Sequence, residues 1–213
     1  NFTPDDLTGK AKCKADLESN CGFTHEPETP IVAMVSRLAA HKGFDLVRRV
    51  LEETLRETEM RFVLLGTGEF ELEDYFSDLA ARYPSRVCVR LEYNKSLSKK
   101  FYAGADMFLM PSKSEPCGLA QMIASRYGTV PIVRETGGLY DTIHAYNKYT
   151  GTGNGFSFTN YNAHEMKAVI ESALAMYRDE KPAWENLVKN VMRVDFSWRV
   201  SAKKYIALYD KMQ

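Results

Sequence analysis

The stretch SKSEPCGLAQ, residues 112–121, places a carboxylate, a thiol and a glycine directly before a predicted helix. The helix is predicted from about Gly118 to Tyr127 because apolar residues recur there at helical spacing. These apolar residues are Leu119, Met122, Ile123 and Tyr127. A turn at this point needs the proline or the glycine of the stretch, but it needs neither Glu115 nor Cys117. These two residues are therefore candidates for chemistry.

The start of this predicted helix is a candidate phosphate site. The backbone N–H groups near Gly118 and Leu119 have no partners inside the helix, and the positive end of the helix dipole lies behind them. Gly118 carries no side chain, so a ligand can approach the backbone closely. Glu115 is on the same loop, where it could face a sugar or a developing positive charge. Cys117 is either a small buried filler or a ligand contact.

A second candidate loop is SRLAAHKGFDL, residues 36–46. Arg37 follows a predicted strand, and Lys42 stands just before Gly43, at which a helix is predicted to start. Two fixed cations at the carboxyl edge of a sheet suit a diphosphate, because arginine offers a planar fork and lysine a point charge. The alternative is a solvated pair of basic residues that caps a turn.

Two glycine-rich turns complete the set. GTGEFE, residues 66–71, imitates a dinucleotide-binding motif but has Glu71 where the third glycine is needed for close helix–strand packing. A tight turn is the favoured interpretation, and an NAD-binding domain is a weak alternative. The sequence contains no G-x-x-x-x-G-K-[ST] motif, which excludes a P-loop nucleotidase. The run Thr136, Gly137 and Gly138 either forms a turn or lines the same cleft.

The elements that position these loops alternate along the chain. Short apolar runs predict strands within residues 30–38, 61–68, 86–93, 105–112, 129–134 and 151–158. Helical periodicity predicts helices at about 44–55, 69–82, 96–104, 118–127, 136–143, 162–178, 182–193 and 197–212. This alternation predicts an α/β, Rossmann-like parallel sheet with helices on both faces. Ligands bind such sheets at the carboxyl ends of the strands, to which all the candidate loops belong.

Composition narrows the function classes. The 213 residues carry 28 basic and 28 acidic side chains, which argues against nucleic-acid binding through a bulk positive field. No apolar run approaches the roughly 20 residues that span a bilayer, so no membrane partner is expected. Four scattered cysteines favour a reducing cytoplasm. The sequence has no D-x-D motif, and neither a bound metal nor a cofactor is expected.

Residues 1–29 are predicted to be an interdomain linker with a helix near Gly9–Ser19, and residues 30–213 are predicted to be the domain.

Several long segments together resemble the C-terminal half of bacterial glycogen synthases and plant starch synthases. They are PIVAMVSRLAAHKGFDL, LLGTGEFELEDYF, GADMFLMPSKSEPCGLAQMIASRYGTVPIVRETGGLYDTI and DFSWRVSAKKYIALY. The resemblance implies a GT-B glycosyltransferase in which two Rossmann-like domains face each other. It implies transfer of glucose from ADP-glucose, with UDP-glucose as the alternative donor. The acceptor is the non-reducing end of an α-1,4-glucan, and the transfer retains configuration without a metal.

The resemblance also implies roles for individual residues. Arg37 and Lys42 match the phosphate-binding pair of the family, and Glu115 matches its catalytic-site glutamate. The loop residues that contact glucose and phosphate, together with the neighbouring glycine-rich turn, match Cys117, Gly118, Leu119, Thr136, Gly137 and Gly138. Tyr93 matches a tyrosine near the nucleotide base. Two departures are Ile123, where related retaining enzymes often carry a second glutamate, and Ala120, where many carry threonine.

The resemblance covers the chain from about residue 30, and the sequence lacks the K-x-G-G loop and acceptor groove of the family's N-terminal domain. The chain begins without an initiator methionine or signal peptide, and is predicted to be a piece of a longer protein that is inactive alone. Trp198, Tyr205 and Tyr209 are expected to lose part of their usual cover. The alternatives are another retaining GT-B transferase, such as a sucrose synthase, and a non-catalytic module that binds a nucleotide sugar or a glucan.

Overall fold

A six-stranded parallel sheet forms the centre of the computed structural model, which describes residues 2–212. The strands are β1 (Ile31–Val35), β2 (Arg61–Leu65), β3 (Val87–Arg90), β4 (Met107–Met110), β5 (Val130–Arg134) and β6 (Phe156–Phe158). Their order across the sheet is β3-β2-β1-β4-β5-β6, and each neighbouring pair is parallel. The predicted α/β, Rossmann-like fold is confirmed.

Helices follow the strands along the chain. They are α1 (Thr8–Cys21), α2 (Phe44–Glu57), α3 (Phe70–Arg82), α4 (Lys95–Gly104), α5 (Ala120–Arg126), α6 (Gly137–Thr142), α7 (Ala163–Asp179), α8 (Lys181–Arg193) and α9 (Trp198–Asp210). A short 3-10 turn, η1 (Ala40–Lys42), precedes α2. Among residues 2–212, no helix is both long and apolar enough to cross a bilayer.

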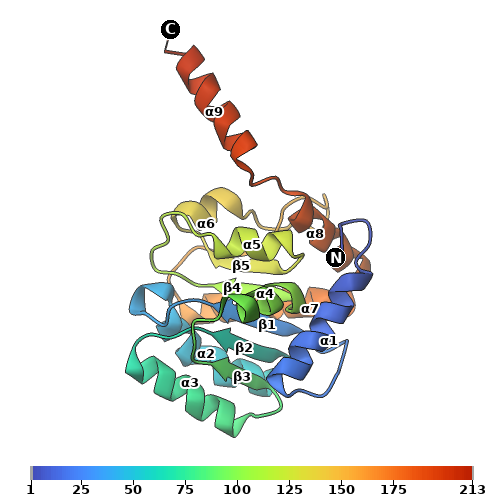
Figure 1. The fold of residues 1–213 in the computed structure, drawn as a ribbon, viewed down its shortest axis with the longest axis vertical. Helices are drawn as coiled ribbons and strands as arrows, with labels where there is room; N and C mark the ends of the chain where they lie inside the picture. The colour runs from blue at the N-terminus through green and yellow to red at the C-terminus, as the bar shows by residue number, and fades with distance from the viewer. Residues whose placement is uncertain (1, 213) are drawn as a thin grey trace.

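Alternate residues of the strands build two cores, one on each face of the sheet. Val32 and Met34 of β1 pack into the core that α2, α3, α7 and α8 complete. Ile31 and Ala33 of the same strand pack into the core that includes α1, α4 and α5. This follows from the two-residue period of a strand, which sends successive side chains to opposite faces. Figure 1 shows helices on both sides of the sheet.

Helix α1 packs into the second core, although its segment, residues 1–29, is predicted from sequence to be a linker. Leu17 is fully buried there. Lys14 Nζ lies 2.7 Å from Asp106 Oδ2, and both side chains are buried. The ammonium of Lys10 donates to oxygen atoms near the carboxyl ends of α4 and α5, at 2.9–3.3 Å. The described part of this segment is therefore part of the folded unit.

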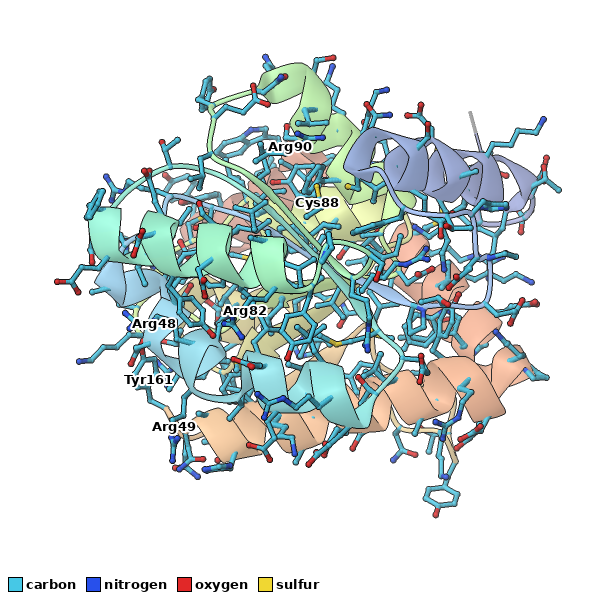
Figure 2. All side chains as sticks on the ribbon, turned by 90° about the horizontal axis from the view of Figure 1, so that it is seen from below. Arg48, Arg49, Arg82, Cys88, Arg90 and Tyr161 are labelled. Atoms are coloured by element: carbon cyan, nitrogen blue, oxygen red, sulfur yellow. The ribbon has the colours of Figure 1, made fainter. Side chains whose placement is uncertain are left out.

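The end of α1 also contacts β2 and β3. Arg61 Nη1 lies 2.7 Å from Glu18 Oε1, and this ion pair is almost completely buried. Arg90 donates to the carbonyl of Asn20 at 2.7 Å. Figure 2 labels Arg90 and Cys88, the residue two places before it on β3. Charged side chains, more than an apolar stripe, fix α1 on the sheet.

Helix α9 extends away from the body of the domain, as Figure 1 shows. None of its residues is buried. Trp198 is 84% exposed, and Tyr205 and Tyr209 are exposed too. All three aromatic side chains, predicted from the sequence to lose cover, are therefore exposed in the structure.

The strand order places a reversal at the middle of the sheet. The chain runs outward from β1 to β2 and β3, and then returns to place β4 on the other side of β1. The loops that follow β1 and β4 consequently leave the carboxyl edge in opposite directions. A crevice opens between such loops, and ligands of α/β sheets bind there.

Candidate functional site

Lys42 and Glu115 meet at this reversal. Lys42 belongs to the loop after β1 and Glu115 to the loop after β4, and Lys42 Nζ lies 2.6 Å from Glu115 Oε2. Ser112 Oγ donates to the same carboxylate oxygen at 3.2 Å. The Glu115 side chain is 10% exposed and that of Lys42 is 22% exposed. The structure thus brings a predicted phosphate-binding cation and the predicted catalytic carboxylate into one ion pair.

The two loops are joined by their backbones as well. The N–H of Lys113 donates to the carbonyl of His41 at 2.9 Å. Gly43, at φ 79°, turns the chain from η1 into α2. A Cβ atom on Gly43 would lie 2.1 Å from the carbonyl oxygen of Pro111, so only glycine lets the two loops approach this closely. The short separation of Lys42 and Glu115 depends on this close approach.

Arg37 and Tyr93 line a cavity of about 440 Å³ at the same carboxyl edge of the sheet. The cavity lies over the carboxyl ends of β1, β2 and β3, and Gly66 and Thr67 of the GTG turn form part of its wall. Tyr93 is 93% exposed, so its ring is free to contact a ligand. The predicted base-contact residue and one predicted phosphate ligand therefore border the same space.

A larger cavity of about 710 Å³ lies elsewhere, between the loop at residues 151–154 and the connection from α8 to α9. Asp141, His144 and Asp195 are among its lining residues. None of the site residues predicted from the sequence lines it. We place the candidate site at the cavity over β1, β2 and β3 because two predicted site residues, Arg37 and Tyr93, line it.

The two glycines of the TGG run, Gly137 and Gly138, pack directly against the backbone of the Glu115 loop. The N–H of Gly138 donates to the carbonyl of Glu115 at 3.0 Å. A Cβ atom on Gly138 would lie 1.8 Å from the carbonyl oxygen of Cys117, and one on Gly137 would lie 2.3 Å from that of Glu115. Thr136 is the N-cap residue of α6. This run holds the neighbouring loop in place by direct backbone contact.

Cys117, Gly118 and Leu119 form the surface of that loop. Cys117 is exposed, so its interpretation as a buried filler is wrong. Gly118 has φ 71°, in the left-handed region that favours glycine. Within residues 2–212, the N–H groups of Gly118 and Leu119 donate to no protein acceptor. Two backbone donors are therefore free for a ligand on an exposed loop.

The predicted helix after the Glu115 loop is present as α5, but it starts later than predicted. It begins at Ala120, not at Gly118, so the two free N–H groups belong to the loop and not to a helix. Its buried residues are Gln121, Ala124 and Ser125, whereas Leu119 and Ile123 are exposed. Small side chains let the helix pack closely against β5 and α8. The apolar spacing thus located the helix but does not identify its buried face.

Two residues that hold the site were missed by the sequence analysis, Arg134 and Gln121. Arg134 donates from Nε to the carbonyl of Ser112 at 2.8 Å and from Nη2 to that of Lys113 at 2.6 Å. Its guanidinium lies over the ring of Tyr161, with 5.6 Å to the ring centre, and Figure 2 labels this tyrosine. An arginine at the last position of a strand, beside the candidate loops, was the available signal.

The groups gathered at the site suit an anionic ligand. Two cations, two free backbone donors, one carboxylate and one exposed aromatic ring lie along a single edge of the sheet. Across residues 2–212, no group of three or more His, Cys, Asp or Glu side chains is placed to hold a metal ion.

Comparison with protein families assigns the chain. Residues 22–191 match the family described as glycosyl transferases group 1, which is most of the sequence. The chain belongs to this family. The match includes all six strands, β1 to β6, with the β1 and β4 loops that carry Lys42 and Glu115. The site described above is thus part of a glycosyltransferase domain.

The chain is similar to bacterial glycogen synthases. It is 48% identical over 211 residues to a glycogen synthase of Bacillus cereus (strain B4264), covering 99% of this chain and 44% of that protein. It is 50% identical over 199 residues to a glycogen synthase of Geobacillus thermodenitrificans, covering 93% of this chain and 41% of that protein. The chain therefore spans less than half the length of these relatives.

A solved structure gives the same assignment. The catalytic domain of starch synthase IV from Arabidopsis thaliana, described as bound to ADP and acarbose, superposes with a TM-score of 0.89 at 36% identity. The superposition covers 99% of this chain and 44% of that one. The predicted resemblance to glycogen and starch synthases is confirmed.

Proposed function

We propose that this chain is the donor-binding half of a glycogen or starch synthase. Its donor is ADP-glucose, and the enzyme transfers glucose to the non-reducing end of an α-1,4-glucan with retention of configuration and without a metal. The observation that carries this proposal is the Lys42–Glu115 pair at the sheet reversal, on the same edge of the sheet as the cavity lined by Arg37 and Tyr93. The glucan synthases among the relatives support the substrate class.

The strand order suggests how the donor lies along the edge. The cavity over β1, β2 and β3 takes the base against Tyr93. The diphosphate lies near Arg37 and Lys42 and reaches the free N–H groups of Gly118 and Leu119. The glucose then lies beside Glu115, over the loop after β4. UDP-glucose would use the same diphosphate and sugar positions, so the base cavity determines the choice between the two donors.

The proposed chemistry is electrostatic. The bond between glucose C1 and the diphosphate oxygen breaks, C1 bonds to a hydroxyl oxygen of the acceptor, and the proton of that hydroxyl passes to the departing diphosphate. Negative charge develops on the departing diphosphate, where Arg37, Lys42 and the loop N–H groups stabilise it. Positive charge develops on the sugar ring, where the Glu115 carboxylate stabilises and orients it. Lys42 keeps this buried carboxylate paired, because a buried charge without a partner is costly.

The acceptor side of the reaction is proposed to come from outside this chain. The chain spans 44% of the Bacillus cereus relative, and a second domain would provide the glucan groove. Leu119 and Ile123 are exposed beside the site, and α9 presents exposed aromatic residues. We expect this chain alone to bind the nucleotide but not to transfer glucose.

The substitution Glu115→Gln in the full-length enzyme tests the proposal. We expect turnover to fall by at least about a hundredfold, whereas ADP affinity changes by less than about fivefold, because the amide keeps the shape and loses the charge. Glucose transfer is measured with ADP-glucose and a glucan acceptor, and ADP affinity by isothermal titration. Glu135→Gln is the control, because Glu135 is one strand further along the same edge and accepts from Ser157 and Thr159. Unchanged turnover in Glu115→Gln would remove Glu115 from the mechanism.

A further inference from the structure

Gln121 connects the Glu115 loop to helix α6 from inside the protein. Its side chain is fully buried on α5. Nε2 donates to the carbonyl of Gly118 at 2.9 Å, with a longer contact of 3.3 Å to that of Cys117. The same nitrogen lies 3.2 Å from Oγ1 of Thr142, which in turn donates to the carbonyl of Gly138. One amide therefore contacts the loop backbone directly and is linked to the α6 backbone through the Thr142 hydroxyl.

The orientation of this amide is fixed by its neighbours. If the amide were turned over, Oε1 would face two carbonyl oxygens, which cannot donate to it. In the orientation observed, Oε1 is buried and has no hydrogen-bond partner within residues 2–212. It faces the loop, because a Cβ atom on Gly118 would lie 2.6 Å from it. An unpartnered buried oxygen destabilises the fold, so the stabilising contribution of this side chain comes from the contacts of Nε2.

Peptide geometry links these contacts to the free donors of the site. In a trans peptide, the carbonyl of one residue and the N–H of the next point in opposite directions. The chain contains no cis peptide among the residues described. When Gln121 holds the Cys117 and Gly118 carbonyls inward, the N–H groups of Gly118 and Leu119 must point away from it. Neither of these N–H groups has an acceptor among residues 2–212.

We propose that Gln121 is a positioning residue for the diphosphate. Its amide fixes two peptide planes of the loop so that the N–H groups of Gly118 and Leu119 face the nucleotide. The inference rests on the proposed function for the identity of the ligand, a nucleoside diphosphate. The orientation of the two peptide planes does not depend on it.

A buried amide that only fills the core is the alternative role. Ser125 provides the matched control for this alternative. It is fully buried on the same face of α5, and its Oγ donates to the carbonyl of Gln121 at 2.8 Å. It makes no hydrogen bond to the loop at residues 115–119. Loss of either side chain should destabilise the fold, but only loss of Gln121 should disturb the loop.

The test compares the wild-type chain with Gln121→Glu, Gln121→Met and Ser125→Ala. Gln121→Glu keeps the shape and replaces the donor by an acceptor, so it separates hydrogen bonding from volume. ADP affinity is measured by isothermal titration below the unfolding temperature of each variant. We expect both Gln121 variants to bind ADP at least about tenfold more weakly and Ser125→Ala to stay within about twofold of wild type. ADP affinity that follows thermal stability across all three variants would overturn the proposal.

Amide hydrogen exchange of the same proteins separates this inference from the proposed function. The N–H groups of Gly138 and Ile123 donate to the loop carbonyls of Glu115 and Leu119, and we expect the peptides that contain these two residues to exchange faster in both Gln121 variants than in Ser125→Ala, with β1 and β2 unchanged. If the wild-type chain binds no ADP, the proposed ligand is wrong, and the exchange data still decide whether Gln121 fixes the loop. Equal exchange at these residues in Gln121→Met and Ser125→Ala would contradict the positioning role.

Discussion

Gly138→Ala is the substitution whose effect on the site follows most directly from the backbone. The new Cβ atom would lie 1.8 Å from the carbonyl oxygen of Cys117 and 2.5 Å from its carbonyl carbon. A carbon and an oxygen in contact are normally at least about 3.3 Å apart. The loop would therefore have to move by about 1.5 Å, whereas binding sites must be held to within about 0.5 Å of their working geometry. No side-chain rotation relieves this clash, because both atoms are backbone.

Two opposing effects set the change in stability. Overpacking of a tight contact costs about 1–3 kcal/mol. Replacing glycine by alanine inside a helix returns about 0.5–1 kcal/mol, and Gly138 lies in α6. We expect a net loss of about 1 kcal/mol in the free energy of unfolding, together with at least about a tenfold loss of ADP affinity. Denaturant unfolding and isothermal titration measure the two quantities separately.

Gly104→Ala is the matched control. Its Cβ atom would lie 2.5 Å from Leu17 Cβ and 2.6 Å from the Cys13 carbonyl oxygen, at the packing of α4 on α1. Gly104 ends α4 just before β4, so it lies at the edge of the sheet opposite the site. We expect a comparable loss of stability and unchanged ADP affinity. If Gly138→Ala also left ADP affinity unchanged, the loop it supports could not be part of the nucleotide site.

Two further substitutions test the cavity proposed to bind the base and the attachment of α1 to the domain. Tyr93→Ala should weaken ADP binding by about tenfold, because stacking of a base on an aromatic ring contributes about 1–3 kcal/mol. The free energy of unfolding should stay unchanged, since the ring is exposed. Equal affinity of the variant and the wild type for ADP would remove Tyr93 from the site. Burial lowers the pKa of Lys10 to about 8, below its value of about 10.4 in an unfolded chain. The unfolded state then binds more protons between these values, so this residue makes stability rise with pH from about 8 to 10. Urea unfolding of Lys10→Met across this range should show a smaller rise than wild type, and identical slopes would contradict the lowered pKa of Lys10.

The sheet and the main parts of the site could be predicted because each depends on a local signal. Continuous apolar runs separated by helical periodicity specify a parallel sheet, and all the predicted strands form. Residues at the carboxyl ends of such strands share one edge. That rule alone was enough to expect Lys42 near Glu115, which the structure places at 2.6 Å.

The missed features depend on contacts between distant segments. Helix α1 has little apolar asymmetry, and its attachment uses Lys10, Lys14 and Glu18, which look like surface residues in a sequence. Helix α5 shows the opposite problem, because Ile123 is exposed whereas Gln121 is buried. Periodicity assumes that the apolar face is the buried one. That assumption fails where an exposed surface adjoins a ligand or another domain.

Isothermal titration of this chain with ADP, UDP and NADH tests the central claim most directly. The claim is that the carboxyl edge around Lys42 and Glu115 is a nucleoside-diphosphate site. We predict saturable binding of ADP, weaker binding of UDP and no binding of NADH. Binding of NADH at least as tight as that of ADP would contradict the claim, and so would the absence of any ADP binding.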